Sequence, residues 1–328
     1  MKIVADSRVL VTGGAGFIGS NLVERLLADG NEVVVLDNFS TGSRQNLAAF
    51  QNNPSFSLIE GDIRDIECCR RAVDGVQYVL HEAALGSVPF SIKDPMSCTA
   101  VNISGFVNML FAAQEAGVKR FVYASSSAVY GDNPVLPKCE SDIGKPLSPY
   151  AITKLTDEIF ARNFHELYGI DTVGMRFFNV FGRRQNPFGV YAAVIPIFVA
   201  DLLKHRAPTI NGDGMVSRDY THVDNVVAAN LLALKAVESE SLNQVYNVAC
   251  GESVTLNRLF ETLRDNLAEF DPAVAAISPV YGPPRRADIP HSLADISKIE
   301  SGLGYKPVRM FADGIKATAR WYVENICK

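Results

Sequence analysis

Cysteine and tryptophan are scarce in this chain of 328 residues, which contains six cysteines and one tryptophan. The cysteines form no Cys-x-x-Cys pair and no zinc-like grouping, so we expect them to be reduced thiols. No apolar run approaches the length of a membrane span, and the first residues lack the apolar core of a signal peptide. These absences argue against a disulfide scaffold, a structural metal site and a membrane protein, and they favour a cytoplasmic location.

Positive charge is not in excess either. The chain has 31 Lys and Arg against 36 Asp and Glu, which gives a net charge of −5 and an isoelectric point near 5.6. This balance argues against nucleic acid or an anionic membrane as a partner, although a local basic site could still bind an anionic small molecule. The length and the 48% hydrophobic content suit one large α/β unit or two closely joined domains.

Strand-like and helix-like segments alternate through the first half of the sequence. The strand-like runs are 8–12, 32–37, 56–62, 77–83, 120–126 and 171–178. The segments with helical periodicity are 17–29, 65–73, 95–116 and 150–168. Strict alternation predicts a parallel sheet with helices on both faces. We therefore predict an α/β fold with a Rossmann-type doubly wound parallel sheet, whose ligand lies at the carboxyl ends of the strands.

The regular alternation ends at about residue 180, where Gly, Pro and Asn become frequent. The segment VYNVA (245–249) still reads as a buried strand, so the chain is expected to return to the sheet. We predict a nucleotide-binding domain over 1–178 with return segments at about 221–250. Residues 179–220 and 251–328 are predicted to form a smaller α/β domain that closes over it.

A glycine-rich segment follows the first strand. VTGGAGFIGSNLVERLLADG (11–30) places Gly13, Gly16 and Gly19 between a strand and an amphipathic helix. Glycines at this point allow a tight turn and let the backbone approach a pyrophosphate at the helix N-terminus. Asp37 ends the next strand, where its carboxylate can accept the adenosine ribose hydroxyls and disfavours a 2′-phosphate. The pattern predicts NAD rather than NADP, and nearby Arg44 is interpreted as a solvated loop residue.

Two further strand ends border the expected cofactor site. GDIR (61–64) offers Asp62 for the adenine edge, or alternatively as part of a turn that caps the next helix. HEAAL (81–85) ends a strand with small residues, as a backbone passing under a cofactor requires. The pair His81–Glu82 lacks the second histidine of a His-Glu-x-x-His motif, so we predict no metal site.

The segment SPYAITK (148–154) carries the candidate catalytic pair. Ser148 and Pro149 suit a helix start, and Tyr150 and Lys154 share one helix face. The phenol of a free tyrosine has a pKa near 10, and an adjacent ammonium would favour its ionised form. Ser126, where the fifth strand meets the expected cleft, could hydrogen-bond a substrate hydroxyl. Together these residues predict proton removal from an alcohol while a hydride passes to NAD.

The chain resembles the extended short-chain dehydrogenase/reductases, and within them the nucleotide-sugar epimerases, especially those of the UDP-N-acetylhexosamine branch. The motifs that carry this resemblance extend over nearly the whole length: TGGAGFIG, LDNFSTG, GDIR, SSSAVYG, SPYAITK, RFFNVFG, INGDG, SRDYTHV and HSLADISK. The resemblance implies bound NAD, a UDP-sugar substrate and a homodimer that pairs the helices corresponding to 95–116 and 150–168. The intact Ser126, Tyr150 and Lys154 argue against a non-enzymatic NAD-sensing regulator on the same fold.

The resemblance also implies a set of cofactor-binding positions. They are Gly13, Gly16, Phe17, Ile18, Gly19, Asp37, Asn38, Gly42, Asp62, Ile63, Ala83, Ala84, Asn102, Tyr150, Lys154, Phe177 and Val180.

Within this family, the residues that follow the motif serine indicate which reaction to expect. Dehydratases of this family carry Asp-Glu after the motif serine or threonine, and decarboxylases usually keep the Glu, whereas this chain has Ser127 and Ala128. Without that acid, elimination is not supported. Oxidation at carbon 4, rotation of the 4-keto sugar and return of the hydride to its other face remain, which is 4-epimerisation.

The substrate-binding positions are likewise implied by the resemblance. They are Ser87, Val88, Ser126, Tyr150, Asn179, Ala193, Val194, Asn211, Arg218, Arg285, Asp288 and Ser292. Arg218 and Arg285 match the diphosphate charge, Asp288 suits the ribose, and Ala193 and Val194 lie at the uracil side. Asn179 is either a sugar or diphosphate contact or a turn residue.

Ser292 carries the substrate hypothesis. It aligns with the position where galactose epimerases restricted to plain sugars hold a tyrosine, and a serine leaves room for a 2-acetamido group. We therefore expect UDP-GlcNAc and UDP-GalNAc as substrates, with UDP-glucose/UDP-galactose or UDP-glucuronate 4-epimerisation as the alternative. Phe90, in VPFS, departs from the VPRS common in this branch.

Overall fold

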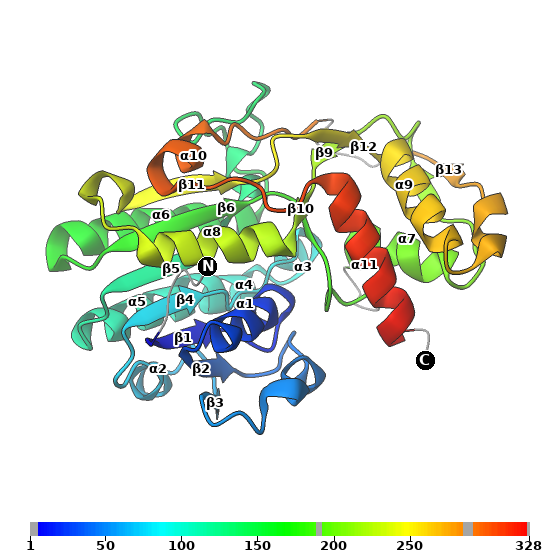
Figure 1. Ribbon diagram of the computed structural model, residues 1–328. Coiled ribbons are helices and arrows are strands. Elements are labelled where there is room, and N and C mark those ends of the chain that lie inside the picture. Colours follow the sequence, from blue (N-terminus) through cyan, green and yellow to red (C-terminus); the bar gives the residue numbers. More distant parts are fainter. Residues whose placement is uncertain (1–5, 188–191, 285–290, 327–328) are drawn as a thin grey trace.

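A seven-stranded sheet forms the centre of the computed structural model, which describes residues 6–187, 192–284 and 291–326 (Figure 1). Its strands are parallel and lie in the order β11-β6-β5-β4-β1-β2-β3. They are β1 (Arg8–Thr12), β2 (Glu32–Asp37), β3 (Phe56–Glu60), β4 (Tyr78–His81), β5 (Arg120–Ser126), β6 (Thr172–Phe177) and β11 (Gln244–Val248). The predicted doubly wound parallel sheet is confirmed, and the chain returns to it through β11.

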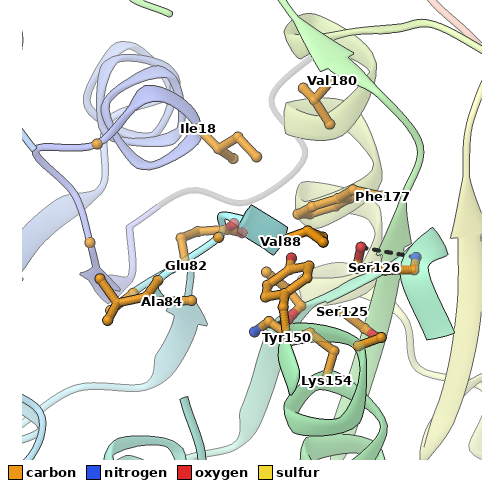
Figure 2. Close-up of a pocket in the computed structure, with 18 of the residues that line it drawn as sticks. Ile18, Glu82, Ala84, Val88, Ser125, Ser126, Tyr150, Lys154, Phe177 and Val180 are labelled. Atoms are coloured by element: carbon orange, nitrogen blue, oxygen red, sulfur yellow. Dashed lines mark hydrogen bonds between the residues drawn. The ribbon is translucent and has the colours of Figure 1, made fainter. Parts of the chain in front are cut away.

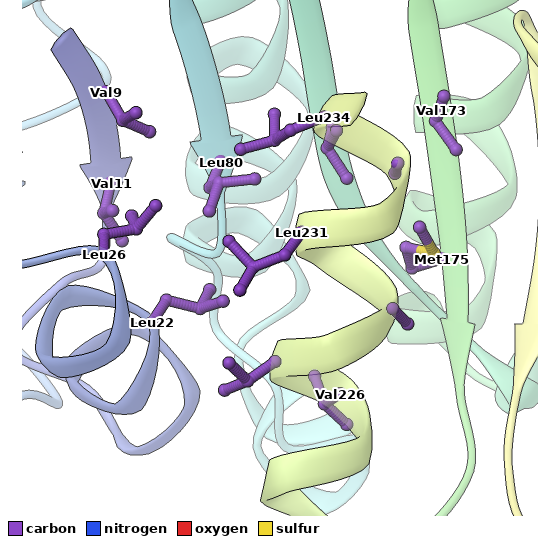
Figure 3. Close-up of a cluster of buried hydrophobic side chains, with 14 of the residues drawn as sticks. Val9, Val11, Leu22, Leu26, Leu80, Val173, Met175, Val226, Leu231 and Leu234 are labelled. Carbon is purple, nitrogen blue, oxygen red and sulfur yellow. The ribbon is translucent and has the colours of Figure 1, made fainter. Parts of the chain in front are cut away.

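Side chains of β1 alternate between two cores, one on each face of the sheet. Val9 and Val11 pack with Leu22 of α1 (Phe17–Ala28) and Leu231 of α8 (Val223–Lys235), as Figure 3 shows, whereas Leu10 joins the core on the opposite face. This alternation follows from the two-residue period of a strand. Because both faces are buried, the strand must be apolar throughout, which is the pattern that RVLVT shows.

Helices cover both faces of the sheet (Figure 1). One face is covered by α1 (Phe17–Ala28), α8 (Val223–Lys235) and α10 (Ser297–Leu303). The other is covered by α2 (Ile66–Ala72), α5 (Phe106–Glu115) and α6 (Pro149–Tyr168). The predicted helix over 150–168 begins one residue earlier, at Pro149. The hydroxyl oxygen of Ser148 caps the first turn of this helix.

The predicted helix over 95–116 is divided into three parts. They are α4 (Pro95–Thr99), a π-helical turn (Ala100–Gly105) and α5. By length and hydropathy the helical segment Pro95–Glu115 could span a membrane, but 44% of the tested window is buried inside the protein. A buried core helix passes the same test, so the absence of a membrane partner stays a prediction.

The C-terminal half has a core of its own, built by α7 (Val194–Leu202), α9 (Leu256–Ala268) and α11 (Phe311–Ile326). Short strand pairs connect it to the sheet. They are β7 (Val180–Phe181) with β10 (Thr221–His222), β9 (Ser217–Asp219) with β12 (Ser253–Thr255), and β8 (Thr209–Asn211) with β13 (Val280–Gly282). The predicted domain boundaries stay a prediction.

The remaining elements are short. They are α3 (Val88–Lys93) and 3₁₀ turns at Arg44–Phe50, Ser127–Tyr130, Ser239–Ser241 and Pro272–Ala276. The cysteines of the described ranges, Cys68, Cys69, Cys98, Cys139 and Cys250, carry free thiols as predicted, and Cys327 lies outside those ranges.

Candidate active site

A pocket of about 1050 Å³ opens at the carboxyl ends of the sheet strands (Figure 2). Its walls come from the segments that follow β1 to β6 and from the first turns of α6, and Arg218, His291 and Ser292 complete them. Parallel strands converge their carboxyl ends at one edge, which is why distant segments meet here. The pocket therefore lies where the sequence predicts the ligand.

The glycine-rich turn brings the backbone of β1, α1 and β4 into close approach. Gly13 has φ +67°, and a Cβ atom there would lie 2.8 Å from the backbone nitrogen of Ala83. A Cβ at Gly19 would lie 2.2 Å from the carbonyl oxygen of Gly13. No side chain caps the first turn of α1, whose N-cap is Gly16. The first N–H groups of this helix are thus open to an anion, as a pyrophosphate site requires.

Asp37 is fixed at the end of β2. Its Oδ2 accepts a hydrogen bond from the backbone N–H of Ala15 at 2.9 Å, and its Oδ1 accepts one from that of Phe39 at 2.8 Å. Arg44 is turned to another partner: its guanidinium pairs with Glu60 at 2.6 Å and stacks over Phe39. The carboxylate keeps lone pairs for ribose hydroxyls, and Arg44 has its own carboxylate, so this end fits NAD.

Asp62 follows β3, the strand that pairs with β2, and forms an ion pair with Arg64. Its side chain accepts hydrogen bonds from Arg64 Nη2 at 2.7 Å and from Asn38 Nδ2 at 2.8 Å. The hydrogen bond from Arg64, against partial burial, lowers the pKa of Asp62 to about 2. Asp62 is therefore a fixed acceptor at neutral pH, and both Asp62 and Asn38 line the pocket.

Tyr150 is held at the start of α6 by two hydroxyls. Its backbone N–H donates to Ser91 Oγ at 3.1 Å, and Ser148 Oγ accepts from Ala151 N at 3.1 Å. The phenol points into the pocket in Figure 2, with Ser126 and Val88 nearby. The helix start thus aims one polar side chain into the cleft.

Lys154 lies one turn further along α6 and is 2% exposed. Its Nζ donates to the carbonyl oxygen of Ala124 at 2.8 Å and lies 3.3 Å from Oδ2 of the buried Asp157. Burial lowers the pKa of Lys154, but the charges of Asp157 and Tyr150 outweigh it and raise the pKa above its ordinary value. Lys154 is therefore an ammonium at neutral pH, positioned within Coulombic range of Tyr150.

The end of β5 presents hydroxyls to the pocket. Ser126 Oγ accepts a hydrogen bond from Ala128 N at 3.1 Å, which leaves its own hydroxyl hydrogen to rotate toward a ligand. Ser125 Oγ donates to Glu158 at 2.5 Å, and Glu158 forms a buried two-point ion pair with Arg176. This ion pair anchors the strand end on which Ser126 stands.

Asn102 acts from behind the pocket wall and is not among the lining residues. Its amide accepts from Leu85 N at 2.8 Å and donates to Leu85 O at 3.2 Å and to Thr153 Oγ1 at 3.1 Å. The π-helical turn places this side chain, as such turns often do near functional sites. Asn102 therefore connects the loop after β4 to α6.

The opposite end of the pocket holds several predicted substrate residues. Ser292 and Arg218 line it, and their segments are joined by the bond from Ser292 N to Ser217 O at 3.1 Å. Asn179 lines it too, although its side chain donates to the carbonyl of Asp219 at 3.0 Å and its φ is +35°. Asn179 thus adopts a turn conformation, which is one of the two roles predicted for it, and it does so at the pocket wall.

The predicted site residues divide into three groups by position. Those that line the pocket are Gly13, Gly16, Phe17, Ile18, Gly19, Asp37, Asn38, Asp62, Ile63, Ala83, Ala84, Val88, Ser126, Tyr150, Lys154, Phe177, Asn179, Val180, Arg218 and Ser292. Those outside its lining are Gly42, Ser87, Asn102, Ala193, Val194 and Asn211. Arg285 and Asp288 lie outside the described residues. The roles of all of them stay predictions.

Four of the predicted site residues outside the pocket lining occupy defined positions in the fold. Gly42 packs against the backbone of Ala15, so a Cβ there would approach it to 2.9 Å. Ser87 caps α3 by accepting from Phe90 N at 3.1 Å. Ala193 is the N-cap residue of α7, and Asn211 ends β8.

Several polar lining residues were not among the site residues predicted from the sequence. Glu82 follows β4, Lys138 is only 5% exposed, and His291 accompanies Ser292. Asp157, which pairs with Lys154, was also missed, although the spacing Lys-x-x-Asp within one helix could have indicated it. No group of three metal-ligating side chains occurs within the ranges that the structure describes.

Comparison with known proteins agrees with this geometry. Residues 9–249 match the model of a family described as the NAD dependent epimerase/dehydratase family. A putative UDP-glucose 4-epimerase of Methanocaldococcus jannaschii is 35% identical over 97% of this chain and 99% of its own. UDP-glucuronate 4-epimerase 4 of Arabidopsis thaliana is 33% identical over 96% of this chain and 75% of its own.

A solved structure is similar over the same extent. It is a UDP-N-acetylglucosamine 4-epimerase from Methanobrevibacter ruminantium M1 in complex with UDP-N-acetylmuramic acid. Its TM-score is 0.91 and its identity 39%, with 98% of this chain and 99% of that chain covered.

Proposed function

Because this chain belongs to the NAD dependent epimerase/dehydratase family, we propose that it interconverts UDP-GlcNAc and UDP-GalNAc. NAD is its cofactor, and its activity is the 4-epimerisation of a nucleotide sugar. The proposal concerns the identity of the sugar and the roles of the residues. The observation that carries it is the small side chain of Ser292 at the pocket wall.

In the proposed mechanism Tyr150 removes the proton from the 4-hydroxyl of the sugar. Lys154 supplies a fixed positive charge beside it, because its ammonium is buried and held by Ala124 and Asp157. Ser126 hydrogen-bonds the same hydroxyl and holds it in line with Tyr150. NAD, held by the glycine-rich turn and Asp37, would supply a hydride acceptor and donor for carbon 4, so the reaction would involve no net oxidation. The proton held on Tyr150 is returned to the sugar in the second half of the reaction.

Two features of the pocket support an acetylated sugar. Ser292 has a short side chain, and Gly86, which also lines the pocket, has none. Filling such a space with a large side chain would exclude a substrate that carries an extra group. One relative of known structure is a UDP-N-acetylglucosamine 4-epimerase, which supports the same choice.

The second candidate is 4-epimerisation of UDP-glucose or UDP-glucuronate. The names of the relatives from M. jannaschii and A. thaliana favour it. The same catalytic residues would serve, because the reaction at carbon 4 does not involve the substituents that distinguish these sugars. The choice therefore depends on the pocket wall around Ser292.

We also propose that the protein is a homodimer joined through α4 and α6. Met96, Ile152 and Ile159 are 79%, 52% and 58% exposed, although they are apolar. Ile152 and Ile159 are seven residues apart, which places them on one face of α6, and α4 packs beside this helix. A second copy of the chain would cover these side chains.

The substrate proposal is tested by NMR. Purified protein is mixed with UDP-GlcNAc without added cofactor, and the anomeric protons are followed, with UDP-glucose and UDP-glucuronate in parallel samples. We expect UDP-GalNAc to appear and the other two sugars to react more slowly. Conversion of UDP-glucose or UDP-glucuronate alone would replace the proposal by the second candidate.

A further inference from the structure

Glu82 has an unusual environment in the cofactor pocket. It directly follows β4, and Figure 2 shows its side chain directed into the pocket, between Ile18 on one side and Tyr150 and Val88 on the other. Its Oε1 atom is buried and has no hydrogen-bond partner. The mechanism proposed above, which uses Tyr150, Lys154 and Ser126, assigns no role to this carboxyl.

An unpartnered buried carboxyl oxygen is costly, because it loses its hydration without compensation. Burial raises the pKa of Glu82 to about 8, although the ammonium of Lys154 opposes the rise. Near neutral pH the side chain can therefore hold a proton or release it with little change in conditions. Such a group is expected to find its missing partner in the ligand that fills the pocket.

The position of Glu82 along the pocket indicates which part of the ligand it meets. The glycine-rich turn and Asp37 form the diphosphate and adenosine end, whereas Tyr150 and Ser126 form the reacting end. Glu82 lies between Ile18, at the start of α1, and Tyr150, at the start of α6 (Figure 2). A dinucleotide bound in this order would bring its nicotinamide half nearest to Glu82, and that half carries ribose hydroxyls and, when oxidised, a positively charged ring.

We propose that Glu82 contacts the nicotinamide half of bound NAD and that its charge strengthens binding of the oxidised over the reduced cofactor. A carboxylate attracts the cationic ring of NAD⁺ and gains nothing from the neutral ring of NADH. Glu82 thus acts as a positioning and tuning residue that opposes loss of the cofactor to its reduced form. The inference rests on the cofactor and is independent of which sugar is the substrate.

Other ionisable groups share this environment. Lys154 and Tyr150 face Glu82 from α6, with Asp157 behind Lys154, and His81 precedes it on β4. Among the described residues, the ionisable side chains elsewhere on the pocket wall are Asp37, Asp62, Tyr130, Lys138, Arg218 and His291. All of them remain in a Glu82→Gln variant, so a difference between that variant and the wild type reports the carboxyl alone.

The test measures cofactor preference in the holoenzyme, without turnover. Holoenzyme is equilibrated with mixtures of NAD⁺ and NADH of known ratio, free cofactor is removed, and the bound ratio is determined by chromatography. Wild type, Glu82→Gln and Glu82→Asp are compared at about pH 6.5 and about pH 9, on either side of the Glu82 pKa. Glu67→Gln, an exposed change on α2, is the matched control.

At about pH 9 we expect the wild type to prefer NAD⁺ by about three- to tenfold more than Glu82→Gln does. At the lower pH the difference should shrink to less than about twofold, because the wild-type carboxyl is then protonated. Glu82→Asp, which keeps the charge, should retain the pH dependence, and Glu67→Gln should match the wild type. Equal preferences in wild type and Glu82→Gln at both pH values would overturn the proposal. Loss of the pH dependence in Glu82→Asp would also overturn it, because that variant keeps the negative charge.

Discussion

The ammonium of Lys154 lies 3.3 Å from the carboxylate of Asp157, three residues further along α6, and both side chains are buried. The pair also places a positive charge beside Tyr150. Removing one member of a buried ion pair is more costly than its net contribution, because the other charge is left without compensation. Asp157 is therefore tied to both the stability and the chemistry of the site.

We expect Asp157→Asn to lower the free energy of unfolding by about 3 kcal/mol and to lower the pKa of Lys154. The alkaline limb of the kcat profile should move to lower pH, because Lys154 then loses its proton earlier. Urea unfolding and a pH profile of sugar conversion measure the two effects. The double variant Lys154→Met, Asp157→Leu should recover stability without activity. An unshifted alkaline limb in Asp157→Asn would show that Asp157 does not raise the pKa of Lys154.

Tyr150→Phe is expected to lower kcat by about a thousandfold while the fold and the bound NAD are retained. The variant lacks only the hydroxyl, and the backbone contact to Ser91 and the Ser148 cap do not depend on it. Conversion is followed by NMR of the anomeric protons, and bound cofactor by its absorbance after release. Full turnover in this variant would refute the catalytic role of Tyr150.

The sheet and the cofactor end of the pocket could be predicted from the sequence because their signals are local. Alternating strand and helix patterns, a glycine-rich turn after β1 and an acid at the end of β2 each lie within a short segment. Tyr150 and Lys154 are one helical turn apart. Local patterns of this kind require no knowledge of which distant segments meet.

The rest depends on contacts between distant residues. Glu82 gains its environment from α6 and α1, and Asn102 connects the loop after β4 to Thr153, fifty-one residues away. The π-helical turn that places Asn102 has no local signature in the sequence. Location in the cell, the absence of nucleic acid and membrane partners, and the domain boundaries stay predictions.

Ser292→Tyr should discriminate against the acetylated sugar. The backbone bond from Ser292 N to Ser217 O is compatible with any side chain, so the added ring should project into the pocket without unfolding the loop. We expect kcat/KM for UDP-GlcNAc to fall by about a hundredfold, and that for UDP-glucose to change by less than about threefold. Ser292→Ala is the control and should preserve both substrates. An equal loss for both sugars would mean that Ser292 does not determine whether the acetamido group is accepted.

His81 should make the protein sensitive to acid. It is buried against Phe106 and Phe121, and its ring nitrogen Nδ1 lies 2.9 Å from the hydroxyl of Thr12. Burial, aided by the charge of Lys154, lowers the pKa of His81 to about 3. In the unfolded chain the imidazole binds a proton below about pH 6.5, so between about pH 6.5 and 3 the unfolded state binds more protons. The free energy of unfolding therefore falls as the pH is lowered through this range.

His81→Phe keeps the ring contacts and removes the titration. Its free energy of unfolding should depend less steeply on pH between about 6 and 4, by about 1.4 kcal/mol per pH unit relative to wild type. Urea unfolding at several pH values measures this slope. His222, whose pKa burial lowers to about 4, contributes the same background to both proteins. Parallel slopes for wild type and variant would show that His81 is not the sensor.

Ile159→Glu should separate the proposed dimer. A carboxylate at the centre of an apolar contact between two copies of α6 would lose its hydration and meet its own symmetry mate. Sedimentation velocity should give wild type at about twice 35.7 kDa and the variant at one chain mass. Val237→Glu is the matched control, because Val237 is apolar and 83% exposed and follows α8, which covers the opposite face of the sheet from α6. A wild-type protein that sediments at 35.7 kDa, or an Ile159→Glu variant that stays at twice this mass, would contradict the proposed interface.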